Sequence, residues 1–135
     1  MTVRLVLPYP VSANRYWATV ARGKRAITYV TEDAKVFKRE CAWIAKQAGC
    51  TNPSSRPIEL TVMLVPRNGV CMDLDNALKV TIDALKGIAY VDDSQVWKIN
   101  AQRSEPDPAG AKTLVEVSEF IPMVSPLFAD ATAAR

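Results

Sequence analysis

Two aspartates separated by a single residue are the first candidates for chemistry in this chain. Asp73 and Asp75 flank Leu74, just before a segment whose apolar spacing predicts a helix. On an extended approach to a helix, alternate side chains share a side, so both carboxylates face the same way while Leu74 points to the core. Lys79 follows Asp75 by four residues and therefore lies on the same helix face, one turn later.

A second acidic pair, Asp92 and Asp93, follows this helix after a short apolar turn. If the chain doubles back after Gly87, we expect the pair to return to the start of the helix and join the first two acids. Converging carboxylates without histidine suit Mg²⁺, a hard cation that prefers oxygen ligands and keeps several waters for a substrate phosphate. Such a metal can polarise a phosphodiester and activate a water, and Lys79 can offset the added negative charge.

Spacing alone leaves a simpler interpretation open. An aspartate before a helix commonly caps it, and two aspartates before a strand commonly form a turn. Asp75 and Lys79 can also form an ordinary surface ion pair, which stabilises a helix by only a few tenths of a kcal/mol. The local pattern therefore allows a metal site and a cap-and-turn arrangement.

Composition removes several other kinds of site. The chain has no histidine among its 135 residues, which excludes Ser-His-Asp triads, Cys-His pairs and zinc bound by histidine. The three cysteines lack metal-type spacing, and we expect reduced thiols in a cytoplasmic protein. No apolar stretch is long enough for a membrane helix, and prolines interrupt the apolar N-terminal segment, so we expect no signal peptide.

The charge distribution suggests a polyanionic partner. The formal net charge is only +3, but lysine and arginine are concentrated in the first third of the chain, whereas acids cluster later. A basic front with an acidic centre suits a protein that holds a nucleic acid and performs metal chemistry on it. A solvated basic surface without a partner is the open alternative.

The periodicity predicts a mixed α/β (α+β) domain, with a small mixed sheet of about four to five strands and two main helices packed on it. Thr31 is a good cap for the first helix, and Gly49 and Gly87 are suited to ending the two helices. We expect one domain over residues 1–124 and a disordered tail over 125–135. The expected strands are 3–7, 58–65, 96–102 and 113–120, with a hairpin of 16–20 and 26–30, and the expected helices are 32–48 and 74–86.

Within this order, two segments resemble a known family. The central block is Asp73-Leu74-Asp75-Asn76, Lys79, Asp83-Ala84-Leu85 and Asp92-Asp93-Ser94-Gln95-Val96. The front, Leu7-Pro8-Tyr9-Pro10 followed by Ser12 and Asn14-Arg15-Tyr16-Trp17, is also similar. Together these segments span about residues 5–103, and they resemble the RusA family of Holliday-junction resolvases.

The resemblance implies a small homodimeric, Mg²⁺-dependent endonuclease of phage and prophage type that resolves four-way DNA junctions by paired nicks. It implies that Asp73, Asp75 and Asp93 are the catalytic, metal-binding acids and that Lys79 is the catalytic lysine. Asp92 ranks below Asp93, as an auxiliary acid or a turn residue. The resemblance implies no organic cofactor and no membrane partner.

Residue type and family position together indicate a DNA-binding set. We expect contacts to DNA from Asn14, Arg15, Lys24, Arg25, Lys38, Arg67, Asn76 and Arg103. One departure concerns the segment before Asp73, where some family members carry a run of basic residues and this chain has only Arg67. The alternatives are a non-catalytic protein of the same fold that binds branched DNA, and a Mg²⁺ phosphohydrolase that acts on nucleotides.

Overall fold

The computed structural model describes residues 2–123, so the expected tail lies outside the described residues. In chain order the elements are β1 (Thr2–Pro8), α1 (Ala13–Tyr16), β2 (Trp17–Arg22), β3 (Arg25–Val30), α2 (Glu32–Gln47), β4 (Ile58–Val65), α3 (Leu74–Leu85), the short 3₁₀ helix η1 (Asp93–Gln95), β5 (Val96–Arg103) and β6 (Lys112–Glu119). The predicted strands and both main helices are present, and the mixed fold class is confirmed. The predicted hairpin is present as β2 and β3, but it forms a sheet of its own, and the short helices α1 and η1 were not predicted.

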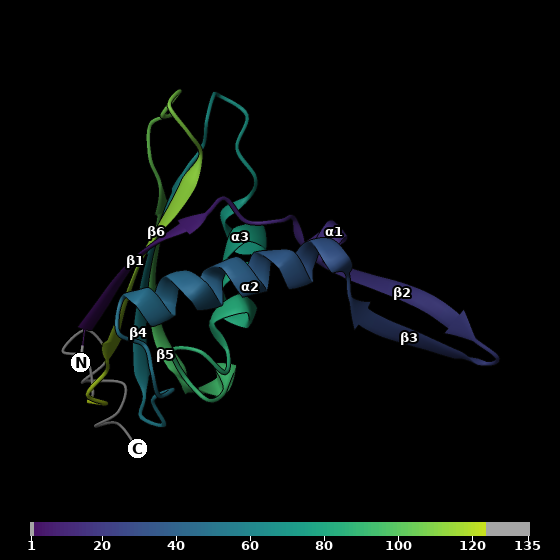
Figure 1. Ribbon diagram of the computed structural model, residues 1–135, viewed down its shortest axis with the longest axis horizontal. Helices are drawn as coiled ribbons and strands as arrows, with labels where there is room; N and C mark the ends of the chain where they lie inside the picture. The colour runs from purple at the N-terminus through teal and green to yellow at the C-terminus, as the bar shows by residue number, and fades with distance from the viewer. Residues whose placement is uncertain (1, 124–135) are drawn as a thin grey trace, which may run out of the picture.

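The larger sheet has four strands in the order β1-β6-β4-β5. Strands β4 and β5 run parallel, whereas the β1–β6 and β6–β4 pairs are antiparallel. Parallel neighbours need a crossover, and α3 provides it between β4 and β5. Figure 1 shows α2 and α3 on one side of this sheet and the β2–β3 ribbon extending away from it. None of the described helices combines the length and apolar character that a membrane span requires.

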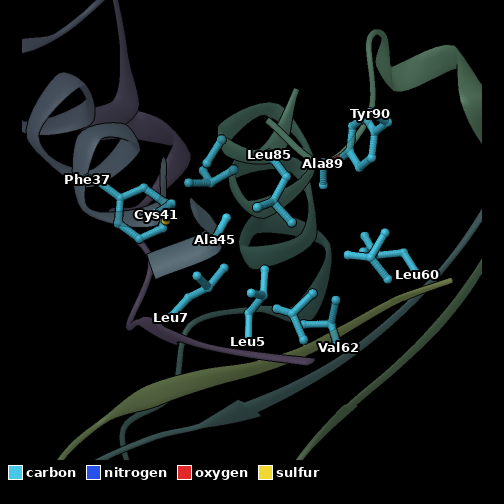
Figure 2. Packing of buried hydrophobic residues seen from close by; sticks show 14 of the residues in the cluster. Leu5, Leu7, Phe37, Cys41, Ala45, Leu60, Val62, Leu85, Ala89 and Tyr90 are labelled. Atoms are coloured by element: carbon cyan, nitrogen blue, oxygen red, sulfur yellow. The ribbon is translucent and has the colours of Figure 1, made fainter. Parts of the chain in front are cut away.

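Helix α2 packs its apolar stripe against the sheet, as its sequence predicts. It begins after Thr31, whose side-chain oxygen accepts a hydrogen bond from the Ala34 amide at 3.3 Å. Figure 2 shows Phe37, Cys41 and Ala45 in the buried cluster together with leucines of β1. The apolar spacing also predicts Val36 in this stripe, but Val36 is 46% exposed because the buried face is centred one position away.

Helix α3 is rotated relative to its predicted stripe. The spacing of Leu74, Leu78, Ile82 and Leu85 in the sequence predicts a buried stripe, but of these only Leu85 is fully buried. The buried face consists of Ala77, Val80, Thr81, Ala84 and Leu85. Small side chains on this face allow close packing against neighbouring elements, so α3 turns its alanines inward. The rotation leaves Asp75 and Lys79 exposed to solvent.

A buried tyrosine connects the front of the chain to α3. The turn-forming residues Ser12 and Asn14 predict a loop over 12–15, but Ala13–Tyr16 forms the one-turn helix α1. Tyr16 is fully buried, and its hydroxyl donates to the Asp83 carboxylate at 2.5 Å. Burial and this hydrogen bond raise the pKa of the Tyr16 phenol, so the hydroxyl remains a donor over the working pH range.

We expect Tyr16→Phe to lower the free energy of unfolding by about 1.5–3 kcal/mol, because it removes a hydrogen bond to a charged group. Urea denaturation of both proteins would measure the difference. Tyr29→Phe is the matched control. Tyr29 is 49% exposed, and the loss of its hydroxyl group should change the free energy of unfolding by less than about 0.5 kcal/mol. Equal stability of the two variants would show that the Tyr16–Asp83 bond does not stabilise the fold.

Candidate active site

Asp73 and Asp75 lie together at the N-terminal end of α3. Asp73 is the N-cap residue and has an extended backbone, but its side chain makes no capping hydrogen bond. Asp75 follows in the first turn, and both residues are exposed. The capping interpretation of Asp73 is therefore wrong, and its carboxylate oxygens are available to a ligand. The helix dipole favours negative charge at this end of α3.

Lys79 lies one turn beyond Asp75, and its ammonium group contacts an aromatic ring instead of an acid. Its ammonium group sits 5.0 Å from the centroid of the Trp17 ring, at the base of β2. Among the described residues, no ion pair joins Lys79 to Asp75, so the simple surface pair is not formed. A cation over an aromatic face is attracted to the ring's quadrupole. Trp17 thereby holds the lysine near the acids without neutralising it.

Trp17 was not predicted as part of the site. The Tyr16 and Trp17 rings pack edge to face, with centroids 4.3 Å apart, and Tyr16 is in turn bonded to Asp83. This packing positions the ring beneath Lys79. The sequence carries no periodic signal for contacts across some sixty residues, and the only hint is that both segments belong to the family resemblance.

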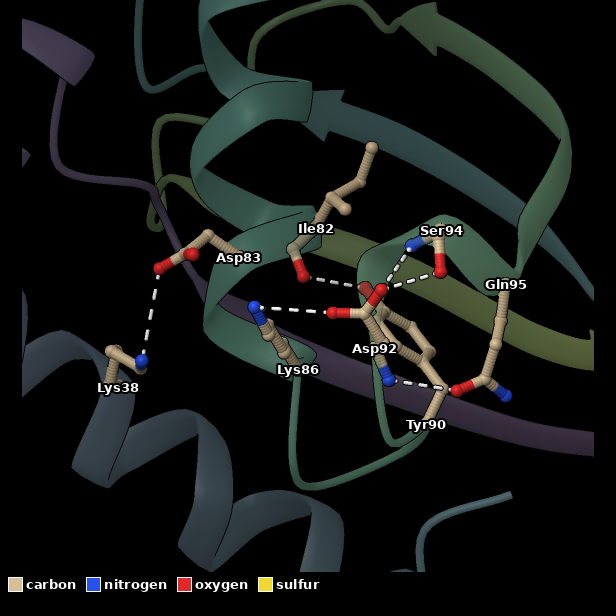
Figure 3. A network of polar contacts seen from close by, with 8 residues as sticks. All are labelled: Lys38, Ile82, Asp83, Lys86, Tyr90, Asp92, Ser94 and Gln95. Atoms are coloured by element: carbon tan, nitrogen blue, oxygen red, sulfur yellow. Dashed lines mark hydrogen bonds and ion pairs between the residues drawn. The ribbon is translucent and has the colours of Figure 1, made fainter. Parts of the chain in front are cut away.

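The second acidic pair lies at the opposite end of α3. Asp92 forms an ion pair of 3.3 Å with Lys86, the residue that caps the C-terminus of α3. Figure 3 shows this pair together with Tyr90, whose hydroxyl donates to the Ile82 carbonyl at 2.6 Å. Asp75 and Lys86 are separated by roughly 16 Å along an α-helix axis. The expected return of the pair to the start of the helix is therefore wrong within one chain.

Asp92 and Asp93 differ in what they do locally. The Asp92 side chain accepts from the Ser94 amide, while the Gln95 side chain accepts from the Asp92 amide, which together form a capping box. The hydrogen bonds from Ser94, followed by the contact with Lys86, lower the pKa of Asp92 to about 2. Asp93 is exposed and takes no part in that box. This arrangement fits the ranking of Asp92 as a turn residue.

The carboxylates of one chain fit a divalent cation only in part. Within residues 2–123, no three acidic or cysteine side chains are close enough to hold one ion. Asp73 and Asp75 alone are a suitable ligand pair, because Mg²⁺ is commonly bound by one or two carboxylates while waters and substrate phosphates complete its octahedron. Asp93 cannot join them without a second chain or a large rearrangement.

The expected DNA-binding residues fall into two groups. Lys24 and Arg25 lie at the tip of the β2–β3 ribbon, whereas Arg67 and Arg103 are exposed near the end of the sheet where α3 begins. Surface cations in such places can contact phosphates. Asn14 is exposed on α1, beside the ribbon.

Three other members of that set already have partners within the chain. Arg15 pairs with Asp33 at 2.8 Å, and Lys38 pairs with Asp83 at 3.7 Å. Asn76 accepts a hydrogen bond from the Ala13 amide at 2.7 Å, which ties α1 to α3. Arg15 can exchange its exposed pair for a phosphate at small cost, because such pairs contribute at most about 1 kcal/mol, whereas the Lys38–Asp83 pair is half-buried. For Asn76, the structure supports a positioning role.

Comparisons with known proteins agree with these features. Residues 8–118 match the family model described as Endodeoxyribonuclease RusA. The crossover junction endodeoxyribonuclease RusA of Escherichia coli O139:H28 is 30% identical over 120 residues, which cover 88% of this chain and 96% of that protein. The proteins of the same name from Escherichia coli K12 and Enterobacteria phage 82 are 31% and 29% identical over 96 residues, covering 70% of this chain and 77% of each relative. The chain therefore belongs to the RusA endodeoxyribonuclease family.

Proposed function

We propose that this protein is a Mg²⁺-dependent, structure-specific endodeoxyribonuclease that resolves four-way DNA junctions by paired symmetric nicks during recombination or repair in the cytoplasm of a bacterial or phage-infected cell. The single observation that carries the proposal is the exposed Asp73–Asp75 pair next to Lys79, in a chain whose relatives are named crossover junction endodeoxyribonucleases. Exposed acids that face phosphates would repel DNA, so the pair favours a metal-dependent reaction over simple binding.

Each residue has a defined role in the proposed reaction. Asp73 and Asp75 bind the cation, and Asp93 supplies a third carboxylate. When bound, Mg²⁺ polarises the scissile phosphate and lowers the pKa of an attacking water. Lys79, placed by the Trp17 ring, stabilises the negative charge that accumulates on the phosphate oxygens. Cleavage of the bond to the 3′ oxygen leaves 5′-phosphate and 3′-hydroxyl ends that a ligase can rejoin.

The homodimer has a particular purpose in this proposal. Asp93 lies at the far end of α3 from the first two acids, so we place the third carboxylate of each site in the second chain. Asp75, Lys79 and Lys86 are exposed along α3. Two such helices, packed antiparallel about a two-fold axis, bring the acidic end of one chain to the Lys86 end of the other. Asp93 of one chain would then lie near Asp73 and Asp75 of the other.

Subunit mixing would test this arrangement. Asp75→Asn and Asp93→Asn proteins should each be inactive, and their mixed dimers should contain one fully wild-type site and one doubly altered site. An equal mixture should therefore recover about a quarter of the wild-type sites, chiefly as single nicks, because random pairing of identical interfaces makes half of the dimers mixed. Sedimentation equilibrium would verify that dimers form. If an equal mixture of the two variants forms mixed dimers and still remains inactive, all three acids of a site must come from one chain.

The substrate itself can be tested against the two rival functions. We expect the protein to nick a synthetic four-way junction in Mg²⁺ and to leave both a linear duplex of the same sequence and a nucleoside triphosphate intact. Junction binding that is indifferent to Mg²⁺, with no cleavage, would favour the non-catalytic alternative. Turnover of the nucleotide but not the junction would identify a nucleotide phosphohydrolase. The lack of a glycine-rich phosphate loop in the sequence counts against the latter.

A further inference from the structure

The β2–β3 ribbon stands apart from the rest of the described structure. Its strands pair from Trp17–Val30 at the base to Arg22–Arg25 at the tip, and every residue from Thr19 to Tyr29 is exposed. Figure 1 shows the ribbon pointing away from the four-stranded sheet, beyond the start of α2. Six residues of β-strand extend about 20 Å. An isolated two-stranded ribbon is marginally stable in water, so a surface partner is expected.

The two faces of the ribbon differ in character. The register places Val20, Ile27 and Tyr29 on one face, where they are 41%, 44% and 49% exposed. Together with Arg22 they line a groove of about 500 Å³. The opposite face carries Thr19 and Thr28, whose hydroxyls are hydrogen-bonded to each other at 3.1 Å, and two alanines nearer the tip. The large apolar residues of the opposite face, Trp17 and Val30, are half-buried at the base, so the exposed large apolar side chains of the ribbon lie on the first face.

The charge of the ribbon indicates what that partner is. Arg22, Lys24 and Arg25 surround the turn, and residues 17–30 contain no acidic residue. The turn is made at Gly23, whose φ of +62° suits glycine. A second copy of this ribbon would bring like charges together, whereas a polyanion would neutralise them. An apolar face that ends in cations therefore fits a nucleic acid with exposed bases.

The base of the ribbon is fixed relative to the candidate active site. The Thr31 amide donates to the Tyr16 carbonyl at 3.0 Å, and the Thr31 hydroxyl donates to the Arg15 carbonyl at 2.5 Å. Trp17, the first residue of β2, packs on Tyr16 and carries the Lys79 ammonium group on its ring. These contacts fix the position of a ligand bound to the ribbon relative to Lys79.

We propose that the apolar face of this ribbon holds open the branch point of a four-way DNA junction. The tip cations contact phosphates, while Val20, Ile27 and Tyr29 pack against bases that have lost a stacking neighbour. In a continuous duplex the bases are stacked and their faces covered, but at a branch point stacking is interrupted. Aromatic side chains stack on unstacked bases, and apolar side chains pack between base steps that have been opened. The inference rests on the proposed junction-directed function and gives the site its selectivity for branched DNA.

The test uses the full-length protein, EDTA in place of Mg²⁺, and a junction with 2-aminopurine at the branch point. Wild-type protein should raise the 2-aminopurine fluorescence severalfold, with no rise when the base is placed in the middle of an arm. The triple variant Val20→Thr, Ile27→Thr, Tyr29→Thr has a β-branched residue at each of the three positions, which suits a strand, and it leaves the basic tip unchanged. It should abolish the rise while weakening junction binding by less than about tenfold, because phosphate contacts remain. The matched control, Thr19→Val with Thr28→Val on the opposite face, should behave as wild type.

Several outcomes would overturn the inference. One is wild-type protein that binds and nicks junctions without any fluorescence rise; another is a triple variant that gives the full rise. A triple variant that sediments as a monomer where the wild type is a dimer would show that this face is a subunit interface instead. Wild-type protein that neither binds nor nicks junctions would refute the proposed function itself, which separates that failure from the failure of this inference.

Discussion

Replacing Asp75 with asparagine is expected to slow nicking of a four-way junction by about 10²–10³-fold, the cost of removing one electrostatic contributor to a transition state. The change keeps the shape of the side chain but removes the charge that, in the proposed site, binds the cation together with Asp73. Asp75 is exposed in the first turn of α3, so the fold should be unaffected. Single-turnover assays on a 5′-labelled junction would measure the rate, and urea denaturation would confirm equal stability.

Junction binding gives this prediction its control. With one negative charge fewer beside the phosphates, Asp75→Asn should bind the junction in EDTA as tightly as wild type, or tighter. Glu116→Gln is a matched loss of charge far from the site: Glu116 pairs with Arg4 on the sheet at 2.9 Å, and the exposed pair contributes little. The control should nick at the wild-type rate. An Asp75→Asn protein that also nicks at that rate would remove Asp75 from the catalytic site.

Replacing Lys79 with methionine should also slow nicking by about 10²–10³-fold, because it removes the side-chain cation that we propose stabilises the charge developing on the scissile phosphate. Methionine keeps an unbranched apolar stem that can still lie on the Trp17 ring, so a structural effect should be small. Lys79→Arg should recover part of the rate, since it retains a cation that can sit on the ring. We would measure all three rates at saturating Mg²⁺ and saturating junction.

The comparison of the two Lys79 variants distinguishes a catalytic role of Lys79 from a structural role at the base of the ribbon. If the ammonium acts on the phosphate, the methionine variant should lose nicking rate while its junction affinity changes by less than about tenfold. Equal rates for the methionine and arginine variants would mean that the charge is not used. A proportional loss of affinity and stability in both variants would instead indicate that Lys79 only supports the ribbon base through Trp17.

The elements that carry strong local signals were predicted well. Helix α2 was expected to begin after Thr31, and it does so because a side-chain cap and an acidic first turn agree with the apolar spacing. Strand β4 alternates buried and partly buried residues along most of its length, as its pattern predicts. The first acidic pair was also placed correctly at the start of α3. In each case, neighbouring residues determine the outcome.

The parts that depend on distant contacts could not be predicted in the same way. Asp93 was expected beside Asp73, but the segment after α3 is held at the end of the helix. Gly87 adopts a φ of +80° and its amide bonds to the Tyr90 carbonyl at 2.7 Å, while the Tyr90 hydroxyl is bonded to α3. These contacts close a tight turn, which no periodicity in the sequence reveals. The resemblance, which does not depend on periodicity, correctly identified the family of the chain. It did not reveal that the two acidic pairs lie at opposite ends of α3.

The most direct test of the central claim is a map of the nicks made on all four strands of a mobile junction, with and without Mg²⁺. We predict cleavage only in Mg²⁺, as paired nicks at symmetric positions in two strands of like polarity, whose ends a DNA ligase can rejoin. The same map from Asp75→Asn protein should be blank. Nicks that persist in EDTA, or no nicks on any strand of a junction that the protein binds, would contradict the metal-dependent site at Asp73 and Asp75.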